Sequence, residues 1–84
     1  MLVMVIERFR DTAAVYQRSK ERGRMLPDGL EYIDSWVDPE GARCFQLMRY
    51  TDVALFEEWA SHWSDLVDFE FIPVISSAEM HTRP

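Results

Sequence analysis

The chain has 84 residues, a net charge of −6 and one cysteine, Cys44. One domain over 1–84 is expected, and because 48% of the residues are apolar while a domain this small hides only roughly 60% of its unfolded surface, a partner surface is expected as well. The net negative charge argues against nucleic-acid binding. A single cysteine cannot form an internal disulfide, which favours a reducing compartment. Because the sequence has neither a signal-peptide pattern nor a run of ~20 apolar residues, we expect a cytoplasmic protein that does not contact membranes.

The first half of the chain predicts a strand, a helix and a second strand. Residues 2–9 are rich in Val, Ile and Phe, which is typical of a strand. Asp11 is a suitable cap for a helix over 12–24. The turn residues of 26–29 then lead into a strand over 30–37.

The second half repeats this order. Residues 38–41 (DPEG) predict a hairpin turn, followed by a strand over 42–50. Asp52 precedes a helix to about residue 63, and 67–75 form the last strand before a loose tail at 78–84. The order β-α-β-β-α-β predicts an α+β fold, the ferredoxin-like sandwich, with strand order 4-1-3-2.

The hairpin turn sets the expected register of its two strands. A three-residue loop at 39–41 gives the pairs Trp36–Cys44, Asp34–Gln46 and Tyr32–Met48, which share one face. The opposite face is more apolar, so we expect the helices to cover Ile33, Ser35, Val37, Phe45 and Leu47, and with them Met4, Ile6, Ile72 and Val74. The open side then receives Val3, Val5, Glu7, Phe9, Phe69, Phe71 and Pro73. Because so aromatic a face should not meet water, we expect a second copy to cover it.

Several stretches resemble domain-of-unknown-function family 3303. They are MVIE at 4–7, GRMLP at 23–27, SWVD at 35–38, RCFQ at 43–46 and WSDLVDFE at 63–70. The resemblance implies a ferredoxin-like subunit of a dimeric α+β barrel and implies no activity. Related barrels include cofactor-free monooxygenases and muconolactone-type isomerases, but that link is through the fold alone, and no catalytic motif from those enzymes can be placed on this sequence.

Glu7, Gln46 and Asp34 form the most interesting polar row. With the expected strand order they lie on one face, and Glu7 and Asp34 stand roughly 10 Å apart across the sheet. Two carboxylates at that distance suit acid–base work on a small ligand, since burial would raise their pKa values. The alternative is that they bond across a subunit interface or meet water.

Other residues give weaker signals. Cys44 is a candidate nucleophile, but a packed, inert thiol is the simpler interpretation. Trp36, with Tyr32 beside it, is either a dimer anchor or the wall of a ligand cavity. His62 and His81 are far apart, and the sequence has no Gly-rich phosphate loop and no nucleophile elbow, so neither a metal nor a cofactor is expected.

Charge is unevenly distributed along the chain. Positive residues crowd the stretch 8–24, whereas 52–79 holds seven acids and no Lys or Arg. The basic stretch is interpreted as a solvated helix face, with an anion site or a patch that orients a second subunit as alternatives.

These observations leave two functions open. The first is a homodimeric α+β barrel that binds a small organic ligand on the open sheet face, with cofactor-free enzyme activity undecided. The alternative is a non-enzymatic module for dimerisation or protein interaction.

Overall fold

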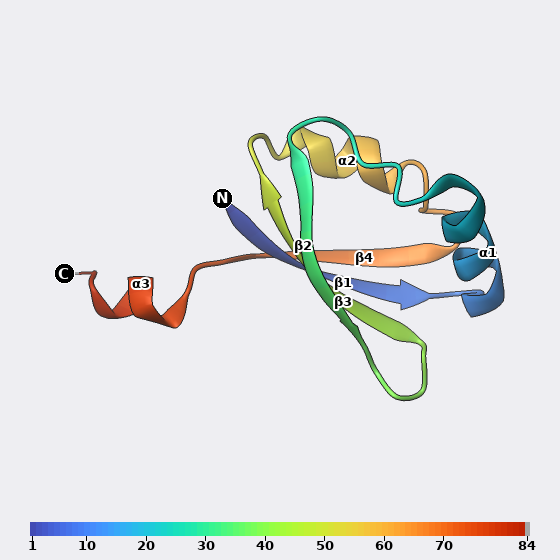
Figure 1. Cartoon of the computed structure of the whole chain (residues 1–84), viewed down its shortest axis with the longest axis horizontal. Coiled ribbons are helices and arrows are strands. Elements are labelled where there is room, and N and C mark those ends of the chain that lie inside the picture. The colour runs from blue at the N-terminus through green and yellow to red at the C-terminus, as the bar shows by residue number, and fades with distance from the viewer. Residues whose placement is uncertain (84) are drawn as a thin grey trace.

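Four antiparallel strands form the sheet of this protein, in the order β2-β3-β1-β4, in a computed structural model that describes residues 1–83 (Figure 1). The elements are β1 (Leu2–Phe9), α1 (Thr12–Arg22), β2 (Leu30–Val37), β3 (Arg43–Tyr50), α2 (Ala54–Ala60), β4 (Val67–Val74) and α3 (Ser77–His81). The predicted ferredoxin-like α+β fold and the strand order are therefore confirmed.

Both main helices are shorter than the sequence predicts. The Asp11 carboxylate accepts a hydrogen bond from the Ala14 N–H at 3.0 Å and caps α1, which ends at Arg22 because Gly23 takes a left-handed φ of 66°. Helix α2 ends at Ala60, and the chain from there to β4 runs through successive turns. No helix in residues 1–83 is long and apolar enough to cross a membrane.

The predicted register of the β2–β3 hairpin is wrong over most of its length. The Asp38 N–H bonds to the Arg43 carbonyl at 3.0 Å, so the loop holds four residues instead of three. Trp36 consequently pairs with Phe45, and a bulge at Ile33 restores the predicted pairing of Tyr32 with Met48. A one-residue slip moves side chains to the opposite face, which is why the faces predicted from this hairpin fail.

The structure inverts the predicted faces of β1, β3 and β4. The helix-covered face carries the residues expected on the open side: Tyr32, Cys44, Gln46 and Met48, together with Val3, Val5, Glu7, Phe9, Phe69, Phe71 and Pro73. The uncovered face carries those expected under the helices: Met4, Ile6, Phe45, Leu47, Ile72 and Val74. In β2 the assignment is correct for residues 34–37, because Ser35 and Val37 share the covered face with Gln46 and Cys44, while Asp34 and Trp36 lie on the uncovered one; it is wrong for Tyr32, which lies beyond the bulge.

Aromatic side chains from α2 and β4 fill the core. The rings of Phe56 and Phe71 stack with centroids 4.7 Å apart, and the ring of Trp59 tilts against that of Phe69 at 5.3 Å. Val15 adds the contribution of α1. Both helices therefore lie on one face of the sheet (Figure 1).

The opposite face, here called the open face, has apolar side chains at its centre and charges at its rim. Its apolar members are Leu2, Met4, Ile6, Trp36, Phe45, Leu47, Ile72 and Val74. Ion pairs Arg8–Glu70 and Arg49–Glu31, at 3.4 and 3.2 Å, lie near opposite ends of the strands. Trp36 is 52% exposed although it lies beside the apolar centre.

The C-terminal segment contains a helix where the sequence predicts a loose tail over 78–84. The Ser76 hydroxyl caps α3 by accepting a hydrogen bond from the Glu79 N–H at 3.0 Å, and every residue of the helix is exposed. Helix α3 extends away from the sheet (Figure 1). Pro84 lies outside the described residues.

Candidate functional site

A cavity of about 130 Å³ lies between the covered face of the sheet and α1. Apolar side chains make most of its wall: Phe9, Val15, Val37, Trp59, Trp63 and Val67. Polar groups of Glu7, Ser19, Arg24, Ser35 and Gln46 also border it, together with the Cys44 thiol and Tyr16. A mostly apolar space with a few placed polar groups is the usual form of a small-molecule site.

Glu7 and Cys44 are direct neighbours on β1 and β3 at the floor of this cavity. Their Cα positions are paired across the two strands, and the side chains are only 9% and 7% exposed. Burial raises the pKa of the Glu7 carboxyl above its ordinary value of 4.5, against the opposing effects of a hydrogen bond with Cys44 and the positive charge of Arg24. Burial and the adjacent Glu7 raise the pKa of the Cys44 thiol to about 12, so this thiol is not a thiolate at neutral pH.

Gln46 extends the polar floor by one more step along β3. Its side chain is 4% exposed, and its amide N–H donates to the sulfur of Met48 at 3.3 Å. Thioether sulfur is a weak acceptor, so the amide retains hydrogen-bonding capacity for a group in the cavity. Carboxyl, thiol and amide thus lie together on an otherwise apolar surface.

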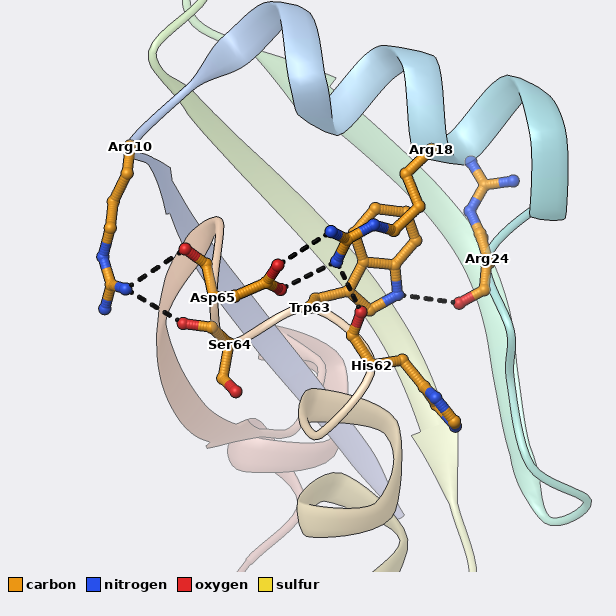
Figure 2. Close-up of polar contacts among 7 residues, drawn as sticks. All are labelled: Arg10, Arg18, Arg24, His62, Trp63, Ser64 and Asp65. Carbon is orange, nitrogen blue, oxygen red and sulfur yellow. Dashed lines mark hydrogen bonds and ion pairs between the residues drawn. The ribbon is translucent and has the colours of Figure 1, made fainter.

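Arg24 lies at the mouth of the cavity, where hydrogen bonds fix its backbone and an aromatic ring supports its side chain. Its carbonyl accepts hydrogen bonds from the indole N–H groups of Trp59 and Trp63, at 3.0 and 3.1 Å (the second drawn in Figure 2). Its guanidinium lies over the ring of Tyr32, 3.7 Å from the centroid. The Tyr32 hydroxyl in turn bonds Ser35 at 2.7 Å. These contacts place a positive charge beside the opening.

A second set of arginine contacts fixes the loop between α2 and β4. Arg18 on α1 donates two hydrogen bonds to the Asp65 carboxylate, at 2.7 and 2.8 Å, and one to the His62 carbonyl at 2.9 Å (Figure 2). Arg10 donates to the Ser64 carbonyl at 3.0 Å. The Arg18 contact lowers the pKa of Asp65. This loop carries Trp63, so the two arginines keep one wall of the cavity in place.

Half of the basic residues in the stretch 8–24 pair with carboxylates of the same chain. Arg8, Arg10 and Arg18 contact Glu70, Asp68 and Asp65, all in the acidic stretch 52–79. These ion pairs join β1 and α1 to β4 and to the loop before it. They account for half of these basic residues without a bound anion.

The predicted site residues divide between the two faces of the sheet. Glu7, Gln46 and Cys44 come together at the cavity floor, and Tyr32 stacks at its mouth. Asp34 and Trp36 lie on the open face, so Asp34 cannot stand across a shared site from Glu7 as the sequence predicts. The N–H of Ser35 donates to the Asp34 carboxylate at 2.8 Å, which forms a local backbone contact.

Arg24 and the indoles of Trp59 and Trp63 carry no sequence pattern that predicts them as parts of one site. The spacing of Trp59 and Trp63 predicts the core face of one helix. Both side chains are buried, at 2% and 6% exposure, but Trp63 lies in the turns that follow α2 and not on the helix. Their shared carbonyl acceptor lies 35 and 39 residues earlier, a distance that no local pattern indicates. Within residues 1–83, no three His, Cys, Asp or Glu side chains gather as a metal site requires.

Among the comparisons with known proteins, only a family model matches this chain. The model of a family described as a domain of unknown function (DUF3303) matches residues 1–82. No curated protein and no solved structure matches the chain.

Proposed function

The chain belongs to this family of domains of unknown function, and we propose that it binds a small organic molecule in the cavity beneath α1, as one subunit of a homodimer built on the open face. The family carries no assigned activity. The proposal therefore rests on geometry and chemistry alone.

The observation that carries the proposal is the polar floor of the cavity. Glu7, Cys44 and Gln46 are each less than a tenth exposed, in a part of the fold that otherwise holds Val, Phe and Trp. Burying an ionisable carboxyl is unfavourable unless something offsets it, and apolar residues would pack this layer more simply. A ligand that bonds to these groups supplies a reason for their presence.

The size of the cavity limits the ligand to about one ring. Its volume is about 130 Å³. An engineered apolar cavity of ~150 Å³ in another protein takes up benzene. A molecule of this size would meet Trp59 and Trp63 along its ring and the polar floor at one end.

Glu7 is the group best suited to exchange a proton with such a ligand. Its raised pKa brings the carboxyl closer to the operating range of a general acid or base. Cys44, protonated at neutral pH, would serve as a hydrogen-bonding neighbour and not as a nucleophile. Enzyme activity, if present, would therefore be acid–base chemistry at Glu7.

The test is a fragment screen by ligand-observed NMR, repeated on Glu7→Gln and on the exposed control Glu58→Gln. We expect single-ring hits that bind the native protein and Glu58→Gln equally and bind Glu7→Gln several-fold more weakly. Hits that bind all three proteins equally would place the site elsewhere. A screen that yields no binder would refute the proposal.

The open face supports the proposed homodimer. It also supports the competing function, a module that serves only for dimerisation or protein interaction. Four strands about 4.8 Å apart, with eight residues each at about 3.4 Å, give a face of roughly 500 Å². Two such faces bury roughly 1,000 Å² in total, the lower limit of a credible biological interface. The ion pairs at the rim and the apolar centre are what such an interface requires.

Light scattering tests the dimer. We expect the native chain to show twice its mass of 9.9 kDa at micromolar concentration. Leu47→Asp, at the centre of the open face, should give a monomer, whereas the control Val53→Asp, at a position 64% exposed, should leave the mass unchanged. A native mass of 9.9 kDa that persists on concentrating would refute the dimer. A dimer that binds no fragment would favour the interaction module.

A further inference from the structure

Arg24 differs from most arginines of this chain in having no acidic partner. Arg8, Arg10, Arg18, Arg43 and Arg49 each contact a carboxylate. No carboxylate of residues 1–83 lies within salt-bridge distance of the Arg24 guanidinium, nor does that group donate a hydrogen bond to another described residue. A positive charge with open donors thus borders the cavity.

The position of this charge is fixed before any ligand arrives. Two indole N–H groups hold the Arg24 carbonyl, and Met25 follows with a left-handed φ of 59° that turns the chain sharply. Tyr32 supports one flat side of the guanidinium at 3.7 Å. A guanidinium stacked in this way keeps its N–H edge available, and that edge matches the two oxygens of a carboxylate.

The charges around the cavity favour a ligand with a single negative charge. Arg24 is the one basic residue among the lining side chains and Glu7 the one acid. The charge of Arg24 acts on the floor, because it opposes the rise in pKa that burial causes at Glu7 and Cys44. A dianion would bring its second charge toward Glu7 with no further cation to balance it.

On the basis of the proposed ligand cavity, we propose that its ligand is a cyclic monocarboxylic acid of about one ring. Its carboxylate pairs with the Arg24 guanidinium at the mouth. Its ring lies between the indoles of Trp59 and Trp63 and the sheet. A neutral polar group at the far end of the ring bonds to Glu7 or Gln46.

Four probes test this class: benzoate, its neutral analogues benzamide and benzyl alcohol, and phenyl phosphate. Calorimetric or NMR titration at low ionic strength should show that benzoate binds the native protein at least about tenfold more tightly than benzamide, the gain typical of a charge-assisted pair. Arg24→Met should remove that preference and leave benzamide binding unchanged. Lys20→Met, which removes an equal charge from an exposed site outside the cavity, should preserve it. Arg24→Met keeps the backbone carbonyl that the two indoles use.

The outcomes separate this inference from the proposed function. Equal binding of benzoate and benzamide by the native protein would overturn the carboxylate assignment while leaving the cavity as a binding site. A benzoate preference retained in Arg24→Met would overturn the role of Arg24. Tighter binding of phenyl phosphate would overturn the monoanion argument. Failure of all four probes would count against this ligand class, and the fragment screen would then decide whether the cavity binds anything.

Discussion

Replacing Trp59 and Trp63 by Phe, singly and together, should produce a loss of stability greater than the sum of the two single losses. Each indole donates to the same acceptor, the Arg24 carbonyl, at 3.0 and 3.1 Å. In either single variant the carbonyl keeps one donor. In the double variant it has none, and because the site of these bonds is only partly buried, the carbonyl without a partner should cost about 1 kcal/mol, the low end of the range for buried groups.

The magnitude follows from the bond and the volume lost. One neutral hydrogen bond contributes about 1 kcal/mol. The change from indole to phenyl removes roughly 40 Å³, which costs about 1 kcal/mol at ~24 cal/mol per Å³ of residual cavity. Each single variant should therefore lose about 2 kcal/mol, and the double variant about 5 kcal/mol, so that about 1 kcal/mol is the coupling.

Urea unfolding followed by far-UV circular dichroism near 10 °C is the suitable assay, because fluorescence would change with the tryptophans themselves. Tyr16→Phe is the control, since Tyr16 lies on α1 away from the open face, is 50% exposed and does not bond the Arg24 carbonyl. We expect this control to change the free energy of unfolding by less than about 0.5 kcal/mol. Single losses that add within about 0.3 kcal/mol would refute the reasoning, since the carbonyl would then have another partner.

Three further predictions concern Glu7, Cys44 and Gly29. The folded chain keeps the Glu7 proton to a higher pH than the unfolded chain does, so the stability that this group contributes falls as the pH rises from 4.5 through the raised pKa. Thermal melts across pH should show that Glu7→Gln flattens this fall. The Cys44 thiol, with a pKa of about 12 and 7% exposure, should react with a thiol reagent far more slowly in the native than in the unfolded protein. Gly29→Ala should lower the melting temperature by about 5 °C or more, because φ is 93° and the new Cβ would lie 2.7 Å from the Thr51 hydroxyl oxygen and 3.0 Å from Leu55.

Each of these predictions has a control and a contrary outcome. Glu58→Gln should leave the pH profile unchanged, and an unchanged profile in Glu7→Gln would show that the carboxyl is not desolvated. Equal thiol reactivity in native and unfolded protein would overturn the buried position of Cys44. Gly41→Ala provides the comparison for Gly29, because its φ of 77° is also left-handed but no atom lies within 4 Å of the added Cβ. Equal losses at both glycines would mean that contact with Thr51 contributes nothing.

The element order could be predicted from sequence because it depends on local chemistry. Asp11 caps a helix and Gly23 ends it, and both act within one turn of chain. The face of each strand could not be predicted in the same way. Both faces of this sheet are apolar, so alternation alone gives no sign of which one the helices cover.

The candidate site was partly predictable for a related reason. Glu7, Cys44 and Gln46 share one face whichever side is covered, since direct strand pairing keeps Glu7 beside Cys44. The separation of Asp34 from them depends on the four-residue hairpin loop, which pairs Asp34 with Leu47 instead of Gln46 and which the residue types of the turn do not predict. Arg24 reaches the site through bonds from residues far along the chain, and only the folded structure reveals them.

The bulge at Ile33 also bears on how copies of this chain can associate. The sheet has two free edges, β2 and β4, and an unprotected edge invites strands from other molecules to add without limit. The bulge interrupts the regular backbone pattern of β2, and Pro73 removes one N–H donor from β4. Endless edge-to-edge growth into fibrils is thereby discouraged at both ends of the sheet. A contact between two open faces, by contrast, occupies the whole face of each copy, so it closes at two copies and offers no site for a third.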